Sequence, residues 1–237
     1  MATWPSALLH IDDIARDTVA VHFGKPVDFR FQPGQTLSLT LPADSPDAPV
    51  LRHTFSLVSA PHEGTLCIAT RIRATPFKQA LATLRPGAEL RLGGPYGTLV
   101  PPADTSRPLV LIAGGIGITP CMSMLRDATH RQSNQQFLLL YSNRTLEQAA
   151  FLEELRGLAR LNPRLRLLAT LTGAADEAWD GARGRIDAAM LRQALMGLNA
   201  PLCYLTGTPA MVEEIRTQLA EAGIPDEAIR DEGFHGY

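Results

Sequence analysis

The sequence predicts two folding units of different class, an antiparallel β half followed by an α/β half built on a parallel sheet. Three observations lead to this prediction. Apolar and polar residues alternate up to Gly97, continuous apolar runs replace the alternation after residue 108, and a chain of 237 residues is long enough for two domains of roughly 100 to 150 residues each. We place the boundary near residue 103, which gives domains 1–103 and 104–237.

The alternation in the first half is typical of strands with one buried face. The clearest of these segments are 18–23, 36–41 and 89–92. Turn-forming pairs, Pro33-Gly34 and Pro86-Gly87, separate them. Several short antiparallel strands at this spacing indicate a sandwich or a small barrel. One helix is expected near residues 76–84.

Each apolar run in the second half is followed by a helical pattern, which is typical of strands buried on both faces of a parallel sheet. The expected strands are 109–113, 137–141, 165–171 and 202–205. The carboxyl ends of parallel strands share one edge, and open sheets of this kind bind ligands there. The residues that follow these strands are therefore the first candidates for a site.

The first of these strands runs directly into a turn that contains Gly114, Gly115 and Gly117. Glycine lets the backbone turn tightly and approach a ligand closely. We expect Thr119 to cap the helix that follows and Pro120 to occupy its first position, so that free amides can bind a phosphate. Pro120 stands where the third glycine of G-x-G-x-x-G would be, which disfavours an ordinary Rossmann dehydrogenase. A turn needed only for packing is the alternative.

Two later strand ends carry related signals. A Gly-Thr-Pro sequence at 207–209 ends one strand and opens a helix, as the first turn does. At another strand end, Thr145 and Gln148 have the spacing of a capping box, which leaves Arg144 free to point into the crevice and bind a phosphate. The alternative for Arg144 is a solvated side chain at a loop tip.

The first half offers two weaker candidates. Arg52, Phe55 and Ser56 on one strand suit a flat ligand that carries a phosphate, and the alternative is an edge strand with a core phenylalanine. Thr75 begins another helix with proline in its first turn, which is a candidate anion site or simply a cap.

Composition excludes several classes of function. The net charge of −2 provides no basic excess for nucleic acid or a membrane surface, and no apolar run approaches the roughly 18 residues of a membrane span. Three cysteines without a C-x-x-C spacing and six histidines without ligand spacing predict no disulfide framework, no metal site and no hydrolase motif. The N-terminus has no signal-peptide pattern. We expect a cytoplasmic monomer.

Together and in order, these motifs resemble the ferredoxin–NADP reductase superfamily along nearly the whole chain. The motifs are Arg-x-x-Phe-Ser at 52–56, Thr-Pro-Phe-Lys at 75–78, Gly-Pro-Tyr-Gly at 94–97, the glycine turn, and Gly-Thr-Pro-Ala-Met at 207–211. The resemblance implies an N-terminal, FAD-binding, six-stranded antiparallel Greek-key barrel and a C-terminal α/β domain that binds NADP or NAD. Flavin and nicotinamide would meet between the two domains.

The resemblance also implies roles for individual residues. Phe55 would lie against the isoalloxazine ring and Ser56 near its N5 atom, where the hydride arrives. Glu232 would relay a proton or orient the nicotinamide, and Phe234 or Tyr237 would cover the flavin. The other residues implied to bind a cofactor are Arg52, His53, Thr54, Thr75, Phe77, Gly114, Gly115, Gly117, Thr119, Pro120, Arg144, Gly207, Thr208 and Met211.

The sequence departs from the family pattern at two places. Arg52 is one residue farther from Phe55 than usual and His53 takes the expected position, so either could contact the FAD phosphates. Thr206 stands where many members have cysteine, and Cys203 cannot replace it because three residues along a strand reverse the face.

The implied activity is transfer of a hydride from NAD(P)H to FAD, followed by transfer of single electrons to a protein carrier such as a ferredoxin or flavodoxin. No iron–sulfur motif occurs, so the acceptor would be a separate protein. The alternatives are the reductase component of an oxygenase, a diaphorase or flavin reductase, and a non-catalytic nucleotide-binding subunit. Arg144 slightly favours NADPH over NADH.

Overall fold

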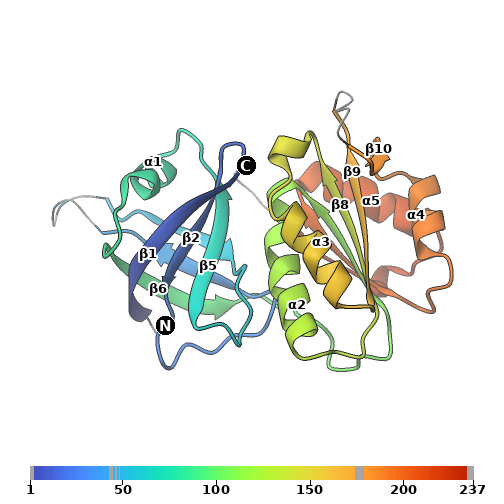
Figure 1. Cartoon of the computed structure of the whole chain (residues 1–237), viewed down its shortest axis with the longest axis horizontal. Coiled ribbons are helices and arrows are strands. Elements are labelled where there is room, and N and C mark those ends of the chain that lie inside the picture. Colours follow the sequence, from blue (N-terminus) through green and yellow to red (C-terminus); the bar gives the residue numbers. More distant parts are fainter. Residues whose placement is uncertain (1–2, 43–44, 46, 48, 174–178, 234–237) are drawn as a thin grey trace.

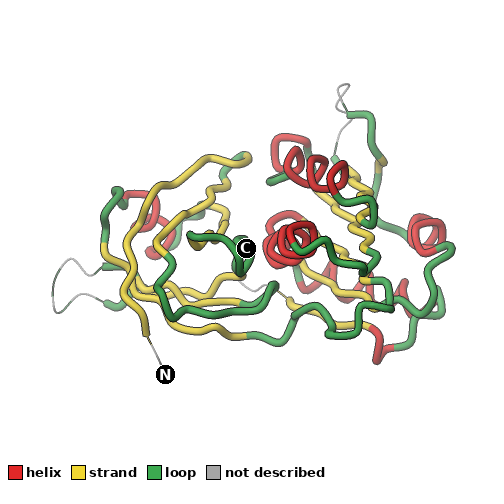
Figure 2. The backbone as a smooth tube through the Cα atoms, turned by 60° about the horizontal axis from the view of Figure 1, so that its bottom comes forward, coloured by secondary structure: helices red, strands yellow, loops and turns green. Residues whose placement is uncertain are grey.

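The computed structural model describes residues 3–42, 45, 47, 49–173 and 179–233. Its described part contains a six-stranded antiparallel sheet followed by a six-stranded parallel sheet with helices on both faces. The two parts lie side by side (Figures 1 and 2). This arrangement confirms the predicted fold class, and the predicted boundary at residue 103 falls in the segment that joins the two sheets. None of the described helices is both long and apolar enough to cross a membrane.

The first sheet closes into a barrel. Its strands, in the order β4-β3-β6-β1-β2-β5, are β1 (Thr3–Ala15), β2 (Thr18–Gly24), β3 (Thr36–Thr40), β4 (Arg52–Ser56), β5 (Thr65–Arg71) and β6 (Glu89–Tyr96). A bridge between Leu57 and Ile68 joins the β4 edge to β5. Alternate residues such as Leu37 and Leu39 fill the interior, and helix α1 (Pro76–Thr83) adds Phe77 to this core.

The second sheet has the order β10-β9-β8-β7-β11-β12, and all its pairs are parallel. Its elements are β7 (Leu109–Gly114), η1 (Gly115–Gly117), α2 (Ile118–His130), β8 (Phe137–Asn143), η2 (Leu146–Gln148), α3 (Leu152–Leu161), β9 (Leu165–Leu171), β10 (Ala182–Arg183), α4 (Ala188–Leu195), β11 (Leu202–Gly207), α5 (Pro209–Glu221), η3 (Asp226–Ala228) and β12 (Ile229–Gly233). The continuous apolar runs thus predicted the four central strands.

Each face of this sheet has its own core. Leu111 and Leu139 pack with α2 and α3, whereas their neighbours Ile112 and Leu140 pack with α4 and α5. Because successive residues of a strand point to opposite faces, burial on both faces needs an unbroken apolar run.

The barrel and the α/β part share a continuous core. Ala20 of β2 and Cys67 and Ala69 of β5 lie in the same apolar cluster as Cys121 and Leu125 of α2. The outer face of β2 and β5 is therefore covered by α2, which lies between the two sheets (Figure 1).

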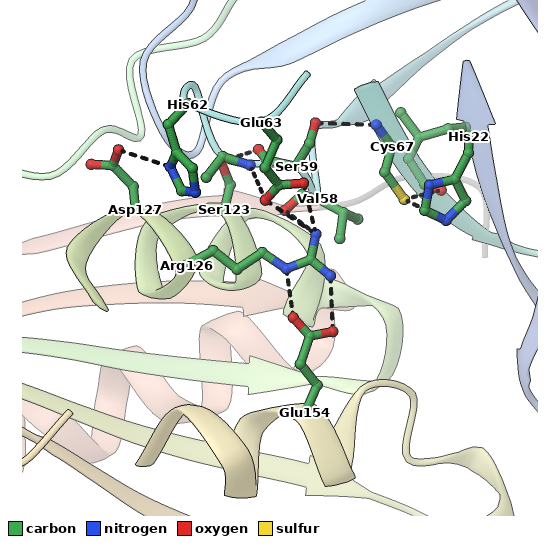
Figure 3. Close-up of polar contacts among 12 residues, drawn as sticks. His22, Val58, Ser59, His62, Glu63, Cys67, Ser123, Arg126, Asp127 and Glu154 are labelled. Carbon is green, nitrogen blue, oxygen red and sulfur yellow. Dashed lines mark hydrogen bonds and ion pairs between the residues drawn. The ribbon is translucent and has the colours of Figure 1, made fainter. Parts of the chain in front are cut away.

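Polar contacts reinforce this boundary (Figure 3). The Ser123 hydroxyl of α2 donates to the Ser59 carbonyl at 2.7 Å. Arg126 forms a two-pronged ion pair with Glu154 of α3 at 2.6 and 2.8 Å, and its Nη1 lies 3.5 Å from both carboxylate oxygens of Glu63. One guanidinium thus connects two helices with the barrel.

Candidate functional site

The order of the parallel strands reverses between β7 and β11. From β7 the chain continues to β8, β9 and β10 on one side and returns to β11 and β12 on the other. Neighbouring strands whose connections leave in opposite directions open a gap at their carboxyl ends, where open α/β sheets bind ligands. The glycine turn at 114–117 and the late turn at 207–209 both lie at this edge, as predicted.

Glycine is needed at the three positions of the first turn for different structural reasons. A Cβ on Gly114 would lie 2.2 Å from the Met211 Sδ atom, and one on Gly117 would lie 2.5 Å from the backbone oxygen of Thr206. Both are needed for close packing against β11 and α5. Gly115 has φ +54°, and a Cβ there would lie 3.2 Å from Nη2 of Arg71. The end of β5 therefore reaches the glycine turn.

The expected cap at Thr119 is wrong. Helix α2 begins at Ile118 without a side-chain cap, and the Thr119 hydroxyl donates to the Ile116 carbonyl at 3.1 Å. Pro120 is the third residue of the helix, not the first as expected. The reason is the single 3₁₀ turn formed by the glycines, which starts the helical path before the expected capping residue.

The late turn behaves as predicted, whereas the capping box does not form. Thr208 caps α5, because its hydroxyl accepts from the Met211 amide at 3.3 Å. At the end of β8, η2 replaces the expected helix start and the Thr145 side chain makes no capping bond. Its buried hydroxyl has no partner among the described residues, and Arg144 beside it is exposed.

A cavity of about 270 Å³ lies between the ends of β8 and β9 and the start of α5. Its polar lining comprises Ser142, Thr172, Arg185, Thr208 and Glu214. Arg185 pairs with Glu214 at 3.1 Å. Sequence reasoning missed Ser142 and Arg185. Arg185 follows the two-residue strand β10, which is too short to give a periodic signal.

The barrel side contributes an aromatic group. His53 and Phe55 share one face of β4 and lie against Phe77 of α1, with ring centroids 4.9 to 5.7 Å apart. Arg52 points to the other face, where its Nη2 donates to the Tyr96 hydroxyl at 3.4 Å. His53, not Arg52, thus shares a face with Phe55.

Positive charge gathers beside this group at the start of α1. Thr75 caps the helix by accepting from the Lys78 amide at 3.4 Å. The Lys78 side chain is buried, and burial, followed by Arg73 and Arg71, lowers its pKa. Burial and then Lys78 lower the pKa of His53. Among the described residues, no carboxylate pairs with Arg71, Arg73 or Lys78, so the positive potential is left to attract an anion.

Sequence reasoning did not single out Arg71 and Lys78 as ligands. A signal was present, because Lys78 is one of two lysines in the chain and directly follows the Thr-Pro-Phe helix start. Arg71 gives no such signal, since only the packing of the barrel against the glycine turn shows its position.

Five buried side-chain polar atoms have no hydrogen-bonding partner among the described residues, and the Ser56 hydroxyl and Oε2 of Glu232 are two of them. Ser56 ends β4, and Glu232 of β12 lies opposite Thr206 at the end of β11. Burial raises the pKa of Glu232. An unpaired buried polar group costs about 1–3 kcal/mol, so both groups fit a site that binds a polar ligand. Phe234 and Tyr237 lie outside the described residues.

Thr206, which lies opposite Glu232, places its hydroxyl beside the thiol of Cys121. Thr206 Oγ1 lies 3.7 Å from the Sγ atom of Cys121 on α2. Cys121 is buried, as predicted, and burial raises its pKa to about 12, so it is a neutral thiol. Cys121 thus places its sulfur beside the position where many members have cysteine.

Comparisons with known proteins agree with this arrangement. A family model described as an oxidoreductase NAD-binding domain matches residues 111–217. Ferredoxin–NADP reductase B of Sorangium cellulosum is 30% identical over 215 residues, which cover 87% of this chain and 86% of that protein. The reductase component of the naphthalene 1,2-dioxygenase system of Pseudomonas putida is 27% identical over 94% of this chain but only 65% of its own length.

Other curated relatives are also longer, and the chain spans about half to two thirds of their length. Among solved structures, a ferredoxin–NADP reductase from Neisseria gonorrhoeae with bound FAD and NADP has a TM-score of 0.83 at 22% identity and covers 98% of both chains. The Amycolatopsis cytochrome P450 reductase GcoB also reaches 0.83, at 25% identity, over 98% of this chain and 70% of its own. The chain belongs to the ferredoxin–NADP reductase superfamily of FAD- and NAD(P)-binding oxidoreductases.

Proposed function

We propose that the chain is a flavoprotein reductase that takes electrons from NAD(P)H through FAD and passes them singly to a small redox protein. The observation that carries this proposal is the junction between Arg71 of the barrel and Gly115 of the parallel sheet. It joins the cationic end of the barrel to the edge that binds nucleotides in sheets of this type. Two ligands, one held on each side, would therefore meet at this junction.

FAD, when bound, would supply the redox chemistry by accepting a hydride and releasing electrons one at a time. The barrel would hold it. We assign the phosphate contact to His53, because Arg52 points to the other face of β4. Lys78 and the free amides after Thr75 would bind the pyrophosphate. Phe55 would contribute an apolar surface for the ring system.

The second nucleotide would lie along the edge of the parallel sheet. The amides of the glycine turn would bind its pyrophosphate, and Thr208 and Met211 would border the nicotinamide. Arg144 is exposed beside this edge and Arg185 lines the cavity there, so both are candidates for the 2′-phosphate of NADPH. We propose NADPH as the preferred donor, which a comparison of kcat/KM for NADPH and NADH tests directly.

Ser56 and Glu232 would act on protons. The Ser56 hydroxyl is a buried donor that no other described residue binds, so it is available to a flavin nitrogen. Burial raises the pKa of the Glu232 carboxyl, and this group would hold or relay a proton beside the bound nucleotides. Thr54 is exposed two residues before Ser56 on β4, and we expect it to contribute only to the rim of the flavin site.

The acceptor we propose is a ferredoxin, a flavodoxin or an oxygenase component. The support is that the relatives include both a ferredoxin–NADP reductase and oxygenase reductase components. We propose that the chain works as a cytoplasmic monomer, which light scattering of the purified protein and fractionation of the cell check.

The first experiment uses the colour of the flavin. The chain reconstituted with FAD should be yellow and should bleach when NADPH or NADH is added under nitrogen. Turnover should then be faster with a ferredoxin or flavodoxin than with free flavin or a quinone. A chain that binds no FAD, or whose FAD neither donor reduces, would contradict the proposal and favour a non-catalytic nucleotide-binding subunit. Faster turnover with free flavin or quinone would favour a diaphorase.

The two lysines of the chain provide a matched test of the flavin site. Lys78→Met should weaken FAD binding by at least about tenfold, because a charge-assisted hydrogen bond to phosphate contributes about 1.5–3 kcal/mol. Lys25 binds the backbone carbonyls of Pro61 and Glu63 instead, so Lys25→Met should leave the Kd unchanged. Equal Kd values for the wild type and Lys78→Met in a fluorescence titration would contradict the assignment.

A further inference from the structure

A row of metal-binding side chains crosses the outside of the barrel. In the pairing of β1 with β2, His10 lies directly opposite His22, and Asp12 lies two residues farther along β1 on the same face. The two imidazole rings are stacked with centroids 4.3 Å apart and planes inclined by 12°. The histidines are distant in the sequence, so ligand spacing along the chain gave no sign of this group.

Three potential ligand atoms converge in this group. Nε2 of His10 and Nε2 of His22 lie 3.3 and 3.5 Å from the same oxygen of Asp12, Oδ2. In the described part of the chain, this is the one place where three such atoms all lie within 4.8 Å of one another. The ion pairs that the structure gives Asp12 are with these two imidazoles alone.

The distances suit a tetrahedral metal ion. Zinc binds imidazole nitrogen and carboxylate oxygen at about 2.0–2.1 Å, so two ligands at the corners of a tetrahedron lie about 3.3 Å apart. The two nitrogen-to-oxygen distances are close to this value before any ion is bound. We propose that His10, Asp12 and His22 form a zinc-binding site on the outer face of the barrel, with water as the fourth ligand.

Burial supports this assignment. His10 and Asp12 are each 54% exposed, so an ion can enter, while the His22 side chain is 24% exposed and held in place.

Binding requires a small rearrangement at His10. The lone pair of an imidazole nitrogen lies in the plane of its ring, so two nearly parallel rings cannot both point at one ion. His10 is exposed and can turn its ring toward the ion, whereas His22 is held between β1 and β5. Nitrogen and oxygen ligands with an open position favour zinc, while magnesium prefers a shell of oxygen atoms.

Cys67 lies behind the site and is not one of its ligands. Its Sγ atom is 3.6 Å from Nε2 of His22 (Figure 3), but it is not within 4.8 Å of all three ligand atoms. Cys67 is 1% exposed, and burial raises its pKa to about 12, so its sulfur remains a protonated thiol.

A second pair of stacked histidines provides the control. His62 and His130 have ring centroids 3.7 Å apart and an inclination of 9°, but the nearest carboxylate oxygen of Asp127 is 4.0 Å from His62. This pair has the same stacking without three converging ligand atoms. A variant of this pair therefore tests whether zinc binding needs the three converging ligand atoms or only two neighbouring imidazoles.

The test is a titration of the flavin-loaded chain with zinc chloride, followed by calorimetry and thermal unfolding. The wild type and His130→Ala should each bind one zinc ion per chain and show a higher Tm with zinc than without it. His10→Ala and Asp12→Asn should bind at least about tenfold more weakly, because each lacks a ligand, and should show no rise in Tm. An excess of magnesium should not displace the zinc.

Two outcomes would overturn the proposal. One is a wild-type chain that binds no zinc at micromolar concentration. The other is equal zinc affinity in the wild type, His10→Ala and Asp12→Asn, since an ion bound elsewhere would not depend on these side chains. Both variants change exposed residues, so retention of flavin and an unchanged Tm without zinc will show that they are folded.

Discussion

At the scale of single residues, the candidate site is marked by polar atoms that the protein itself leaves unpaired. Most buried polar groups in folded proteins have a hydrogen-bonding partner. The Ser56 hydroxyl and Oε2 of Glu232 have none among the described residues, and both lie at strand ends. Each unpaired atom lowers the stability of the ligand-free chain, and a ligand that bonds to these atoms would recover that free energy on binding.

Ser56→Ala should have different effects on the FAD-free chain and on the FAD-loaded chain. Without its unpaired hydroxyl, the FAD-free chain should be as stable as the wild type or more stable. FAD should remain bound, but its reduction by NADPH in anaerobic stopped flow should slow by at least about tenfold, because a hydrogen-bond donor at the reacting ring is lost.

Ser123→Ala is the matched control for this variant. The Ser123 hydroxyl is buried and paired with the Ser59 carbonyl. Its loss should lower the free energy of unfolding by about 0.5–1.5 kcal/mol and leave the reduction rate unchanged. An unchanged rate in Ser56→Ala would rule out the proposed role of its hydroxyl.

The raised pKa of Glu232 makes stability depend on pH. Burial raises this pKa above its ordinary value of 4.5, so the folded state binds the proton more tightly than the unfolded state does. Stability from this group is complete below about pH 4.5 and declines as the pH rises through the folded-state pKa.

Glu232→Gln removes this titration. As the pH rises above about 4.5, the unfolding free energy of the wild type should fall relative to that of the variant until the pH passes the folded-state pKa of Glu232, as measured by urea denaturation. Glu221→Gln, which changes an exposed glutamate of α5, should show no such trend. A constant difference between wild type and Glu232→Gln across this range would be inconsistent with the raised pKa.

At the scale of elements, the sequence predicted the helices and strands that have a clear hydrophobic periodicity. The continuous apolar runs gave β7, β8, β9 and β11, because a strand buried on both faces must be apolar throughout. The edge strand β12 was missed, since Ile-Arg-Asp-Glu-Gly is too polar for that pattern. The cap at Thr119 was wrong because the glycines form a 3₁₀ turn, a choice that depends on packing against β11.

The same limit applies to the site. Motifs identified the glycine turn, Thr75, Thr208 and the strand of Phe55, because each has a local conformational reason. Lys78 directly follows one of these motifs, whereas the positions of Arg71 and Arg185 depend on which elements become neighbours. No pattern along the chain records that β5 ends beside the glycine turn.

The close contact at Gly117 predicts a strong effect of a single methyl group. Gly117→Ala would place Cβ 2.5 Å from the Thr206 backbone oxygen, which cannot move aside as a side chain can. The free energy of unfolding should fall by about 1–3 kcal/mol or more. Gly64→Ala meets nothing within 4 Å and should be close to neutral. Equal stabilities of the two variants in urea would show that the turn is not packed as described.

At the scale of the whole molecule, the barrel and the α/β part share an apolar core, and Arg126 adds a partly buried ionic link between them. Arg126 of α2 contacts both Glu154 of α3 and Glu63 of the barrel, and its side chain is only 18% exposed. A guanidinium held by two carboxylates at a partly buried position leaves two unpaired charges when it is removed.

Arg126→Met should therefore lower the free energy of unfolding by about 1–3 kcal/mol, a value reduced from that of a fully buried pair because both carboxylates are partly exposed. Arg156→Met removes more exposed pairs with Glu153 and Asp180, and should cost less than about 1 kcal/mol. If Arg126→Met is no less stable than Arg156→Met in urea, the cation is not what connects the two parts.

The continuous core beneath α2 also restricts how reductases of this kind can be recombined. A chimera that grafts a foreign nucleotide-binding half onto this barrel would set new side chains against Ala20, Cys67 and Ala69, whose small size matches the α2 surface of this chain. The interface between the barrel and the grafted half would be poorly packed unless helix α2 is transferred together with β2 and β5. Successful crossover points for engineering should therefore keep these three elements from one parent.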